Sequence, residues 1–470
     1  MKNTAIRVAA VGAVAALIAS IAPLTAQAAT TPTYDATTDA PIYLMDGTTA
    51  LDIPDGTQMD WNFADGVILT ASRATASSTE DQFRLPAATG AATFLFCVLN
   101  PAMRLGLPIR VRGAVPPGFL AVADIIQDGM THWPAKTTEC TRVPIEVLPE
   151  PGSTQIDAAP AVAAGPDRRG VACFFSGGVD SFDAVLSNND EITHLIYVHG
   201  FDTPLANKAM RRRNAQALRM AAAEMGKTLV EVETNLREFT ATQTNWGMPS
   251  ARSVQVGLSY LLSPQFRKIY IGADCSDYWP GYPEVESARG ACVDAGDVQI
   301  VFHGRDRLRQ EKIAFLSRSE VAMRWLRVCW LNKGTTYNCG QCEKCLRTMI
   351  GLHLVGALDR CRTFDRPIEL AALRRMVFPS GMAPFWEEII QALESKGEMA
   401  LAAEARQRLE SVLSAAGNPA ELELLKAQAR LEELEEERLR MTSSHSWQLT
   451  APLRGVGKLV RELRKTSFGR

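Results

Sequence analysis

The run Ser176-Gly177-Gly178-Val179-Asp180-Ser181 has the residue types that bind an anion. It follows the apolar stretch Val171–Phe175 and opens a segment with helical periodicity, so backbone N–H groups and the positive end of a helix should converge there. Glycines let the backbone approach phosphate oxygens closely. Ser176 and Ser181 add hydroxyl donors, and Asp180 can help to hold the Mg²⁺ that accompanies a polyphosphate. The pattern is not a Walker loop, and the alternative is a chance strand-to-helix turn.

Four cysteines crowd into a short segment further along the chain. Cys329 lies ten positions before Cys339, and Cys339, Cys342 and Cys345 are spaced C-x-x-C-x-x-C. Four thiolates in this span can surround one tetrahedral Zn²⁺ and leave no open position, so the metal is predicted to be structural. An iron–sulfur cluster is the alternative. Clustering of this kind favours a metal over a disulfide framework and therefore a reducing compartment.

The elements that must position these residues are predicted from five apolar runs with few charges. The runs are VACFFSGG, HLIYVHG, TLVEVETN, KIYIGAD and VQIVFHG. Long helical stretches such as ANKAMRRRNAQALRMAAAEMG separate most of them. Strands buried on both faces and joined by helices predict an α/β fold with a doubly wound parallel sheet. Ligands bind beyond the carboxyl ends of such strands, which is where SGGVDS begins.

SGGVDS after a first buried strand resembles the signature of the PP-loop ATP pyrophosphatases, a HUP-like family that includes asparagine synthetase and tRNA-modifying enzymes. The resemblance implies that Ser176–Ser181 bind Mg-ATP, with Asp180 and Ser181 in catalytic roles. It also implies cleavage between the α and β phosphates, adenylation of a substrate oxygen and displacement of AMP by a nucleophile. Preorganised N–H groups that bind the departing pyrophosphate would stabilise the transition state more than the ground state.

A narrower resemblance, to 7-cyano-7-deazaguanine synthase, covers about Val171 to Leu354. It rests on the phosphate loop, on the cysteine pattern followed by Leu-Arg, and on GADCSDYWPGYPE. The matching residues of that last run are Gly272, Asp277, Tyr278, Gly281, Tyr282 and Pro283. The resemblance implies that Gly272 belongs to the nucleotide site and that Asp277, Tyr278 and Tyr282 contact substrate. His199-Gly200-Phe201-Asp202 departs from the family's Asp-Tyr-Gly-Gln run, so we predict the same activation chemistry with a different acceptor.

Several of these residues also have a structural interpretation. His199 can be a general base or an adenine contact, but a structural histidine is the favoured interpretation. Lys312 can contact phosphate, but a solvated helix lysine is favoured. Asp277 and Tyr278 fit turn positions as well as a substrate site.

The N-terminus conflicts with the rest of the chain. Lys2 and Arg7 precede the apolar run Val8–Leu24, and Ala26-Gln27-Ala28 forms an A-x-A cleavage pattern, so residues 1–29 have the parts of a signal peptide. ATP and reduced thiolates predict the cytoplasm instead. A true start at Met45 or Met59, or a membrane-tethered form, would remove the conflict.

Composition divides the remainder of the chain. Residues 45–150 are predicted to form a small mixed α/β domain, 151–170 a linker, and 171–393 the PP-loop domain with its zinc site. Residues 394–441 are helical or coiled-coil in character and could support a homo-oligomer or a partner, or pack as a solvated helix on their own domain. The basic tail 442–470 contains SWQLTAPLR, which resembles a run near the C-terminus of bacterial surface-polysaccharide glycosyltransferases.

The predicted function is that of an ATP-dependent carbon–nitrogen ligase that adenylates a small-molecule carboxylate. Ammonia or an amine would then displace AMP, because no glutaminase signature is present. The tail resemblance suggests a sugar carboxylate in surface glycan modification. A tRNA-modifying or thiolating enzyme is one alternative, but the net charge of −2 and the single RRR run at Arg211–Arg213 make nucleic acid an unfavoured partner. A noncatalytic nucleotide-binding scaffold is the other alternative.

Overall fold

The computed structural model describes most of the chain. The described residues are 33–35, 50–51, 67–74, 81–82, 90–112, 115–131, 140–148, 169–234, 236–237, 248–274, 292–294, 298–332 and 336–450. The signal-peptide prediction for 1–29, nearly all of the linker, the basic tail beyond 450, and Asp277, Tyr278 and Tyr282 therefore lie outside the described residues. The chain forms two compact units, one of residues 1–340 and 347–367, the other of 341–346 and 368–470.

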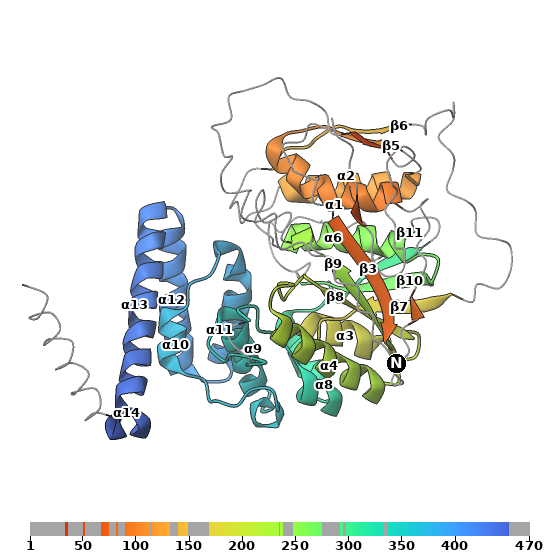
Figure 1. Cartoon of the computed structure of the whole chain (residues 1–470). Coiled ribbons are helices and arrows are strands. Elements are labelled where there is room, and N and C mark those ends of the chain that lie inside the picture. Colours follow the sequence, from red (N-terminus) through yellow and green to blue (C-terminus); the bar gives the residue numbers. More distant parts are fainter. Residues whose placement is uncertain are drawn as a thin grey trace, which may run out of the picture. The chain divides into compact units, whose positions relative to one another are not determined.

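The first unit is built on a sheet whose five central strands are parallel (Figure 1). These strands are β7 (Gly170–Phe174), β8 (His194–His199), β9 (Thr228–Thr234), β10 (Phe266–Gly272) and β12 (Gln299–His303). They are the five apolar runs of the sequence, and their spatial order is β12-β10-β7-β8-β9. The predicted doubly wound parallel sheet is confirmed. The order is Rossmann-like and consistent with a HUP-like fold.

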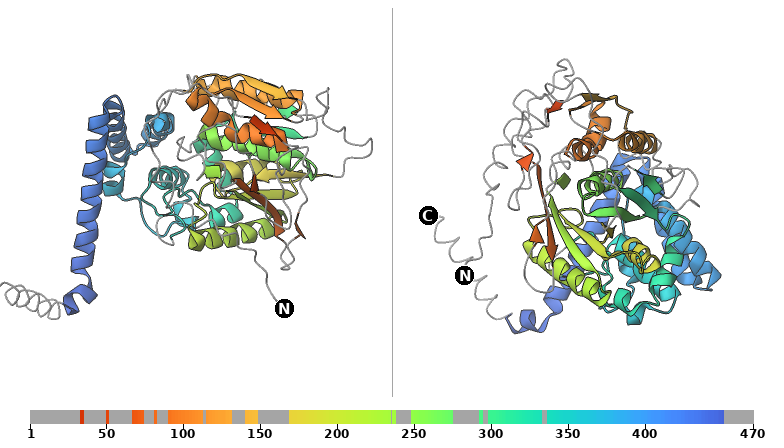
Figure 2. Two further views of the ribbon diagram at one scale, coloured as in Figure 1. Left: turned by 45° about the horizontal axis from the view of Figure 1, so that its top comes forward. Right: turned by 90° about the vertical axis from the view of Figure 1, so that its right-hand side faces the viewer.

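Helices cover both faces of this sheet (Figures 1 and 2). On one face lie α3 (Val179–Ser187), α4 (Lys208–Glu224) and α8 (Glu320–Trp325). The opposite face carries α6 (Met248–Leu261), whereas α7 (Arg309–Leu316) packs against α3. Since the central strands bury apolar side chains on both faces, covering helices are required on each.

Antiparallel strands extend the sheet at both edges. They are β3 (Val67–Ala74), which pairs with β9 and with β2 (Ala50–Leu51) and β4 (Asp81–Gln82), and β11 (Cys292–Asp294), which pairs with β12. A separate parallel sheet contains β1 (Thr33–Asp35), β5 (Ile109–Arg112) and β6 (Ile145–Leu148). The described part of 45–150 is thus of mixed α/β composition and contributes β3 directly to the central sheet.

Two further helices, α1 (Gly90–Leu105) and α2 (Pro117–Thr131), lie between this small sheet and α6. The α1–α6 contact is close because Gly257 has no side chain: a Cβ there would lie 3.0 Å from the Thr93 carbonyl oxygen. The Thr93 hydroxyl donates to the Gly257 carbonyl, and the Ser253 hydroxyl donates to the Phe96 carbonyl. Buried residues of α1, α2, α6 and the central strands form one hydrophobic core.

Helices dominate the C-terminal part of the chain. The helices are α9 (Glu343–Leu354), which includes the last cysteine of the cluster, α10 (Leu370–Arg375), α11 (Ala383–Ser395), α12 (Met399–Ala416), α13 (Pro419–Ser443) and α14 (His445–Leu449), with 3₁₀ turns η3 (Leu358–Arg360) and η4 (Ser380–Met382). The predicted C-terminal helices are confirmed. In the second unit α12 packs between α11 and α13, so α13 is a helix that packs on its own unit. It also exposes Leu424, Leu431 and Leu434.

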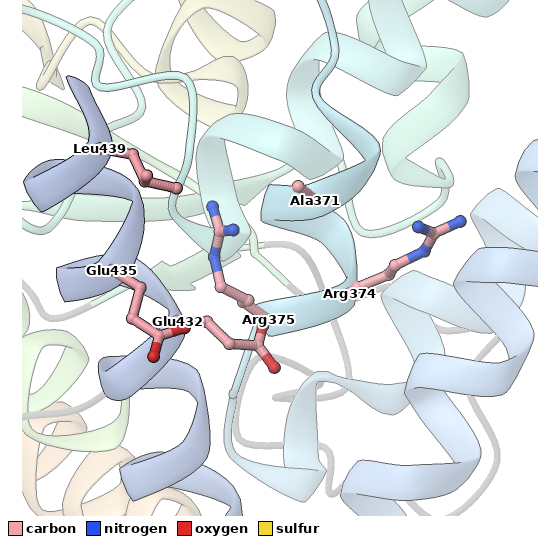
Figure 3. A pocket seen from close by; sticks show the side chains of 6 residues that line it. All are labelled: Ala371, Arg374, Arg375, Glu432, Glu435 and Leu439. Atoms are coloured by element: carbon pink, nitrogen blue, oxygen red, sulfur yellow. The ribbon is translucent and has the colours of Figure 1, made fainter. Parts of the chain in front are cut away.

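An open pocket of the second unit lies between α10 and α13 (Figure 3). Arg375 shares it with Glu432 and Glu435, while Arg374 points away and pairs with Glu404. Charges of both signs line this pocket, so it has no evident preference for an anion. Among the residues that the structure describes, none of the helices has the length and hydropathy needed to cross a membrane.

Candidate phosphate loop and metal centre

The phosphate loop, Ser176–Ser181, joins the carboxyl end of β7 to α3. It stands at the point where the strand order reverses, since the chain proceeds from β7 through β8 to β9 on one side and through β10 to β12 on the other. This switch point is where open α/β sheets bind ligands. Gly178 is the N-cap of α3 and supplies no capping side chain. The first turn of α3 therefore presents backbone donors and the positive helix end to an anion.

Glycine is needed at one position of this loop and at one position of β10 that packs against it. Gly177 has φ +76°, a conformation that L side chains rarely adopt. Gly272, at the end of β10, is packed so closely on α3 that a Cβ there would lie 2.4 Å from the Asp180 carbonyl oxygen and 2.6 Å from its carbonyl carbon. Gly272, predicted as a nucleotide contact, thus allows the end of β10 to meet the first turn of α3.

The Asp180 carboxylate points at two cations of α7 rather than at solvent. Its Oδ2 lies 3.0 Å from Arg309 Nη1, and its Oδ1 lies 3.5 Å from Lys312 Nζ. Asp180 is only 8% exposed. This arrangement does not fit the expected magnesium ligand, because the two cations already neutralise the carboxylate. The Ser181 hydroxyl donates to the Gly178 carbonyl at 3.0 Å, inside the loop itself.

The favoured interpretation of Lys312 as a solvated helix lysine is wrong. Lys312 is 1% exposed, and its Nζ donates to the Ala273 carbonyl at 2.6 Å as well as contacting Asp180. Helical periodicity could not reveal this burial, because α7 is short and the Asp180 carboxylate that compensates the lysine comes from α3. Arg309, 3% exposed on the same helix, was not predicted as a site residue for the same reason.

A second polar group lies beside the first, on the next turn of α3. Asp183 Oδ1 accepts from Arg307 at 2.7 Å, and Asp183 Oδ2 lies 3.6 Å from His303 Nε2. Burial raises the pKa of the Asp183 carboxyl to about 6, although the charge of Arg307 opposes the rise. Burial, together with the positive charge of Arg307, lowers the pKa of His303 to about 4.

His199 ends β8 at the same edge of the sheet. Its Nε2 is hydrogen-bonded to Glu231 Oε2 at 2.8 Å, and Arg211 lies 3.5 Å from Nδ1. Glu231 is buried and also accepts from Arg219. Burial alone would raise the pKa of Glu231, but the hydrogen bonds from His199 and Arg219 prevail and lower it. These contacts fit the favoured interpretation of His199 as a structural histidine.

Buried Arg252 of α6 was also not predicted from the sequence. Its Nη2 donates to the Gly272 carbonyl at 2.7 Å and lies 2.8 Å from Asp274 Oδ2. Arg252 therefore holds the segment that leaves β10 beside the phosphate loop. A single arginine in a helical stretch carries no sequence signal of this kind, because its partners lie at and just beyond the end of β10.

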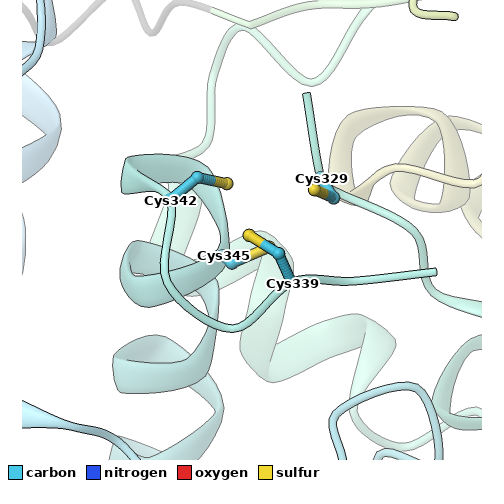
Figure 4. A group of neighbouring side chains, drawn as sticks. All are labelled: Cys329, Cys339, Cys342 and Cys345. Carbon is cyan, nitrogen blue, oxygen red and sulfur yellow. The ribbon is translucent and has the colours of Figure 1, made fainter. Parts of the chain in front are cut away.

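The four predicted cysteine ligands come together (Figure 4). The sulfur atoms of Cys329, Cys339, Cys342 and Cys345 all lie within 4.8 Å of one another, and three of these residues are buried. In a tetrahedral zinc–thiolate site with Zn–S distances of about 2.3 Å, sulfur atoms are about 3.8 Å apart. The donor set thus fits a metal ion such as zinc after a contraction of at most about 1 Å. Cys345 lies in the first turn of α9, whereas the other three precede the helix.

Local backbone features shape the cysteine segment. Gly340, within the C-G-x-C turn, has φ +68° and would place a Cβ 2.5 Å from Arg366 Cδ. Asn338 is 2% exposed, and its Oδ1 accepts from both Val328 N and Cys329 N. The turn thus requires glycine, and the buried amide of Asn338 connects the two arms that carry Cys329 and Cys339.

Comparisons with known proteins add no family assignment. No protein-family model, no curated protein and no solved structure matches this chain. Its function must therefore be inferred from the loop, the sheet that carries it and the cysteine cluster.

Proposed function

We propose that this protein is an ATP-dependent ligase of the PP-loop type, which adenylates a carboxylate and releases AMP and pyrophosphate. The observation that carries the proposal is the SGGVDS loop at the switch point of a parallel sheet, with the first turn of α3 lacking a side-chain cap. Backbone donors at such a position suit a polyphosphate, and the absence of a Walker lysine favours this type of loop over the P-loop type.

In the first step a carboxylate oxygen of the substrate attacks the α-phosphorus of Mg-ATP, and the bond from that phosphorus to the oxygen bridging to the β-phosphorus breaks. The electron pair leaves with pyrophosphate, which the loop N–H groups and the hydroxyl of Ser176 receive. Arg309 and Lys312, held by Asp180, add positive charge near the first turn of α3. Preorganised donors of this kind stabilise charge that builds on a leaving group.

In the second step ammonia or an amine attacks the acyl carbon of the adenylate. The acyl carbon–oxygen bond to AMP breaks, AMP departs with that electron pair, and the nitrogen loses a proton to yield the amide. Zinc in the four-cysteine site would have no open position for substrate or water, so it would supply folding energy rather than chemistry. Magnesium is expected as the counterion of the ATP phosphates.

Product analysis with Mg-ATP, ammonia and a panel of carboxylates tests the proposal. Sugar carboxylates such as uronic acids belong in the panel because of the tail resemblance. We expect acceptor-dependent AMP and pyrophosphate, separated from ADP by chromatography. Formation of ADP would contradict the adenylating mechanism, and failure to bind Mg-ATP would contradict the nucleotide site itself.

Gly178→Ala is the matched test of the loop. Gly178 has φ −80°, which alanine tolerates, and its Cβ would lie 3.3 Å from Ser176 Oγ and 3.7 Å from the Arg327 carbonyl oxygen. The variant should fold while the added methyl group crowds the Ser176 hydroxyl, one of the proposed phosphate donors, so pyrophosphate release should fall. Gly417→Ala is the control, because no atom lies within 4 Å of the added Cβ and its φ of −79° is unstrained.

A further inference from the structure

The segment that leads from α8 to the first cysteine, Trp325–Cys329, lies directly behind the phosphate loop. Arg327 N donates to the Gly177 carbonyl at 2.8 Å. A Cβ on Gly177 would lie 3.6 Å from the Trp325 carbonyl oxygen, and one on Gly178 would lie 3.7 Å from that of Arg327. The backbone of residues 325–327 thus supports both glycines of the loop.

The same segment is hydrogen-bonded to the residues that directly precede Cys339. Asn338 Oδ1 accepts from Val328 N at 2.9 Å and from Cys329 N at 3.1 Å, and Asn338 Nδ2 donates to the Leu326 carbonyl at 2.9 Å. The neighbouring Tyr337 hydroxyl donates to the Trp325 carbonyl at 3.1 Å. Two consecutive residues just before Cys339 therefore hold four of the five residues of 325–329.

The Arg327 side chain fixes the segment from inside the first unit. Arg327 is 4% exposed, and its Nη2 donates to the Thr203 hydroxyl at 3.4 Å and to Asn332 Oδ1. Asn332 adopts φ +49°, an unusual conformation for a residue other than glycine. Arg327 is therefore part of a buried, hydrogen-bonded segment in which Cys329 follows two residues further along the backbone.

The contact with Gly177 determines where a loop donor points. A trans peptide unit is planar, so its C=O and N–H groups point in opposite directions. When Arg327 N holds the Gly177 carbonyl, the N–H of Gly178 is turned away from the cysteine segment. The Gly178 N–H then points to the side of the loop where the anion is proposed to bind.

We infer that metal binding at the four cysteines positions the phosphate loop through residues 325–329, and that Asn338 is the positioning residue that connects the two sites. The inference rests on the proposed function, since it concerns the same anion site. A metal bridging Cys329 and Cys339 closes the two arms on which the Asn338 hydrogen bonds depend. If the metal increases the affinity of the loop for an anion by some factor, reciprocity of coupled binding requires that the anion increase the affinity for the metal by the same factor.

The test uses the full chain loaded with zinc, with inorganic pyrophosphate as the probe. Asn338→Ala removes all three hydrogen bonds of the amide but none of the four sulfur ligands, so zinc should still bind at one ion per chain. Gln127→Ala is the control, because Gln127 is an equally buried amide whose Oε1 accepts from Val143 N, remote in the fold from the cysteines. Calorimetry gives the Kd of pyrophosphate, and competition with a colorimetric chelator gives the zinc affinity.

In the wild-type protein, saturating pyrophosphate should raise the zinc affinity roughly 5- to 150-fold, the usual range of coupling between sites. Asn338→Ala should weaken pyrophosphate binding by a similar factor and abolish the effect of pyrophosphate on zinc, whereas Gln127→Ala should change neither. Pyrophosphate binding that is unaffected by Asn338→Ala, with zinc affinity indifferent to pyrophosphate, would overturn the inference and leave the proposed function standing. A zinc-loaded wild-type protein that binds neither pyrophosphate nor Mg-ATP would overturn both.

Discussion

Gly272→Ala should damage the phosphate loop although Gly272 itself lies outside it, at the end of β10. The new Cβ would lie 2.4 Å from the Asp180 carbonyl oxygen, whereas ordinary van der Waals contacts of Cβ atoms begin at 3.4 Å. The obstructing atoms are backbone atoms in the first turn of α3, so no side chain can rotate away. The end of β10 and the start of α3 must therefore separate by about 1 Å, comparable to inserting a methyl group into a filled core.

Overpacking of this kind costs about 1 to 3 kcal/mol of folding free energy. A displacement of about 1 Å in a group that positions a reacting phosphate lowers the rate by about 100-fold. We therefore expect Gly272→Ala to unfold at a lower urea concentration and to form AMP from ATP about 100-fold more slowly than wild type. Arg252 should amplify the effect, because its Nη2 is bonded to the Gly272 carbonyl.

The assays are urea unfolding followed by circular dichroism and acceptor-dependent pyrophosphate release at saturating Mg-ATP. Gly417→Ala serves again as the control, since its Cβ meets no atom within 4 Å. If Gly272→Ala matched this control in both assays, the close approach of β10 to α3 would be wrong and the geometric case for the loop would fail.

Three further predictions concern buried charge and the cysteine centre. In the folded protein the His303 imidazole stays neutral, since burial and Arg307 lower its pKa from 6.5 to about 4. The stability that His303 contributes is therefore present above pH 6.5 and is lost as the pH falls toward 4. The loss from pH 7.5 to pH 5 should be about 2 kcal/mol, measured as the difference in unfolding free energy between wild type and His303→Gln at each pH, and a difference that did not change with pH would contradict the burial argument. Asp180→Asn leaves two buried cations without their carboxylate and should lower the free energy of unfolding in urea by about 3 to 5 kcal/mol. Lys312→Met should cost less, because Arg309 keeps its partner. The reverse order would show that Asp180 does not compensate both cations. Cys345→Ser should release bound zinc and lower the melting temperature. Mutation of Cys173, which lies outside the cluster, should leave the zinc content unchanged. A Cys345→Ser protein that kept one zinc ion per chain would show that Cys345 is not a ligand.

Local sequence patterns were sufficient for the five central strands and for the cysteine cluster. The five apolar runs became β7, β8, β9, β10 and β12, because a strand buried on both faces needs a continuous apolar run whatever its neighbours are. The cysteine spacing likewise predicted a cluster, since the four ligands lie within one short segment and need few distant contacts to meet.

The partners of charged side chains could not be predicted in the same way. Lys312 and Arg309 are spaced as residues of a solvated helix would be, and only the packing of α7 on α3 gives them a buried carboxylate. The pairing of Asp180 with α7 was not predicted either, and magnesium was expected beside it instead. A carboxylate in a glycine-rich loop gives no sign in the sequence of the helix that packs behind it. Burial of an ion pair depends on two elements, and neither element encodes it alone.

By itself the sequence determined a parallel α/β sheet, a glycine-rich loop at the end of its first central strand, four cysteines suited to one metal, and C-terminal helices. These are local properties, set by periodicity, backbone freedom and ligand spacing within short segments. Tertiary structure alone decided that β3 joins the sheet, that Gly272 meets the first turn of α3, and that Arg327 connects the cysteine segment to the loop. Each of these contacts joins residues far apart in the chain, so it exists only once the sheet has brought them together.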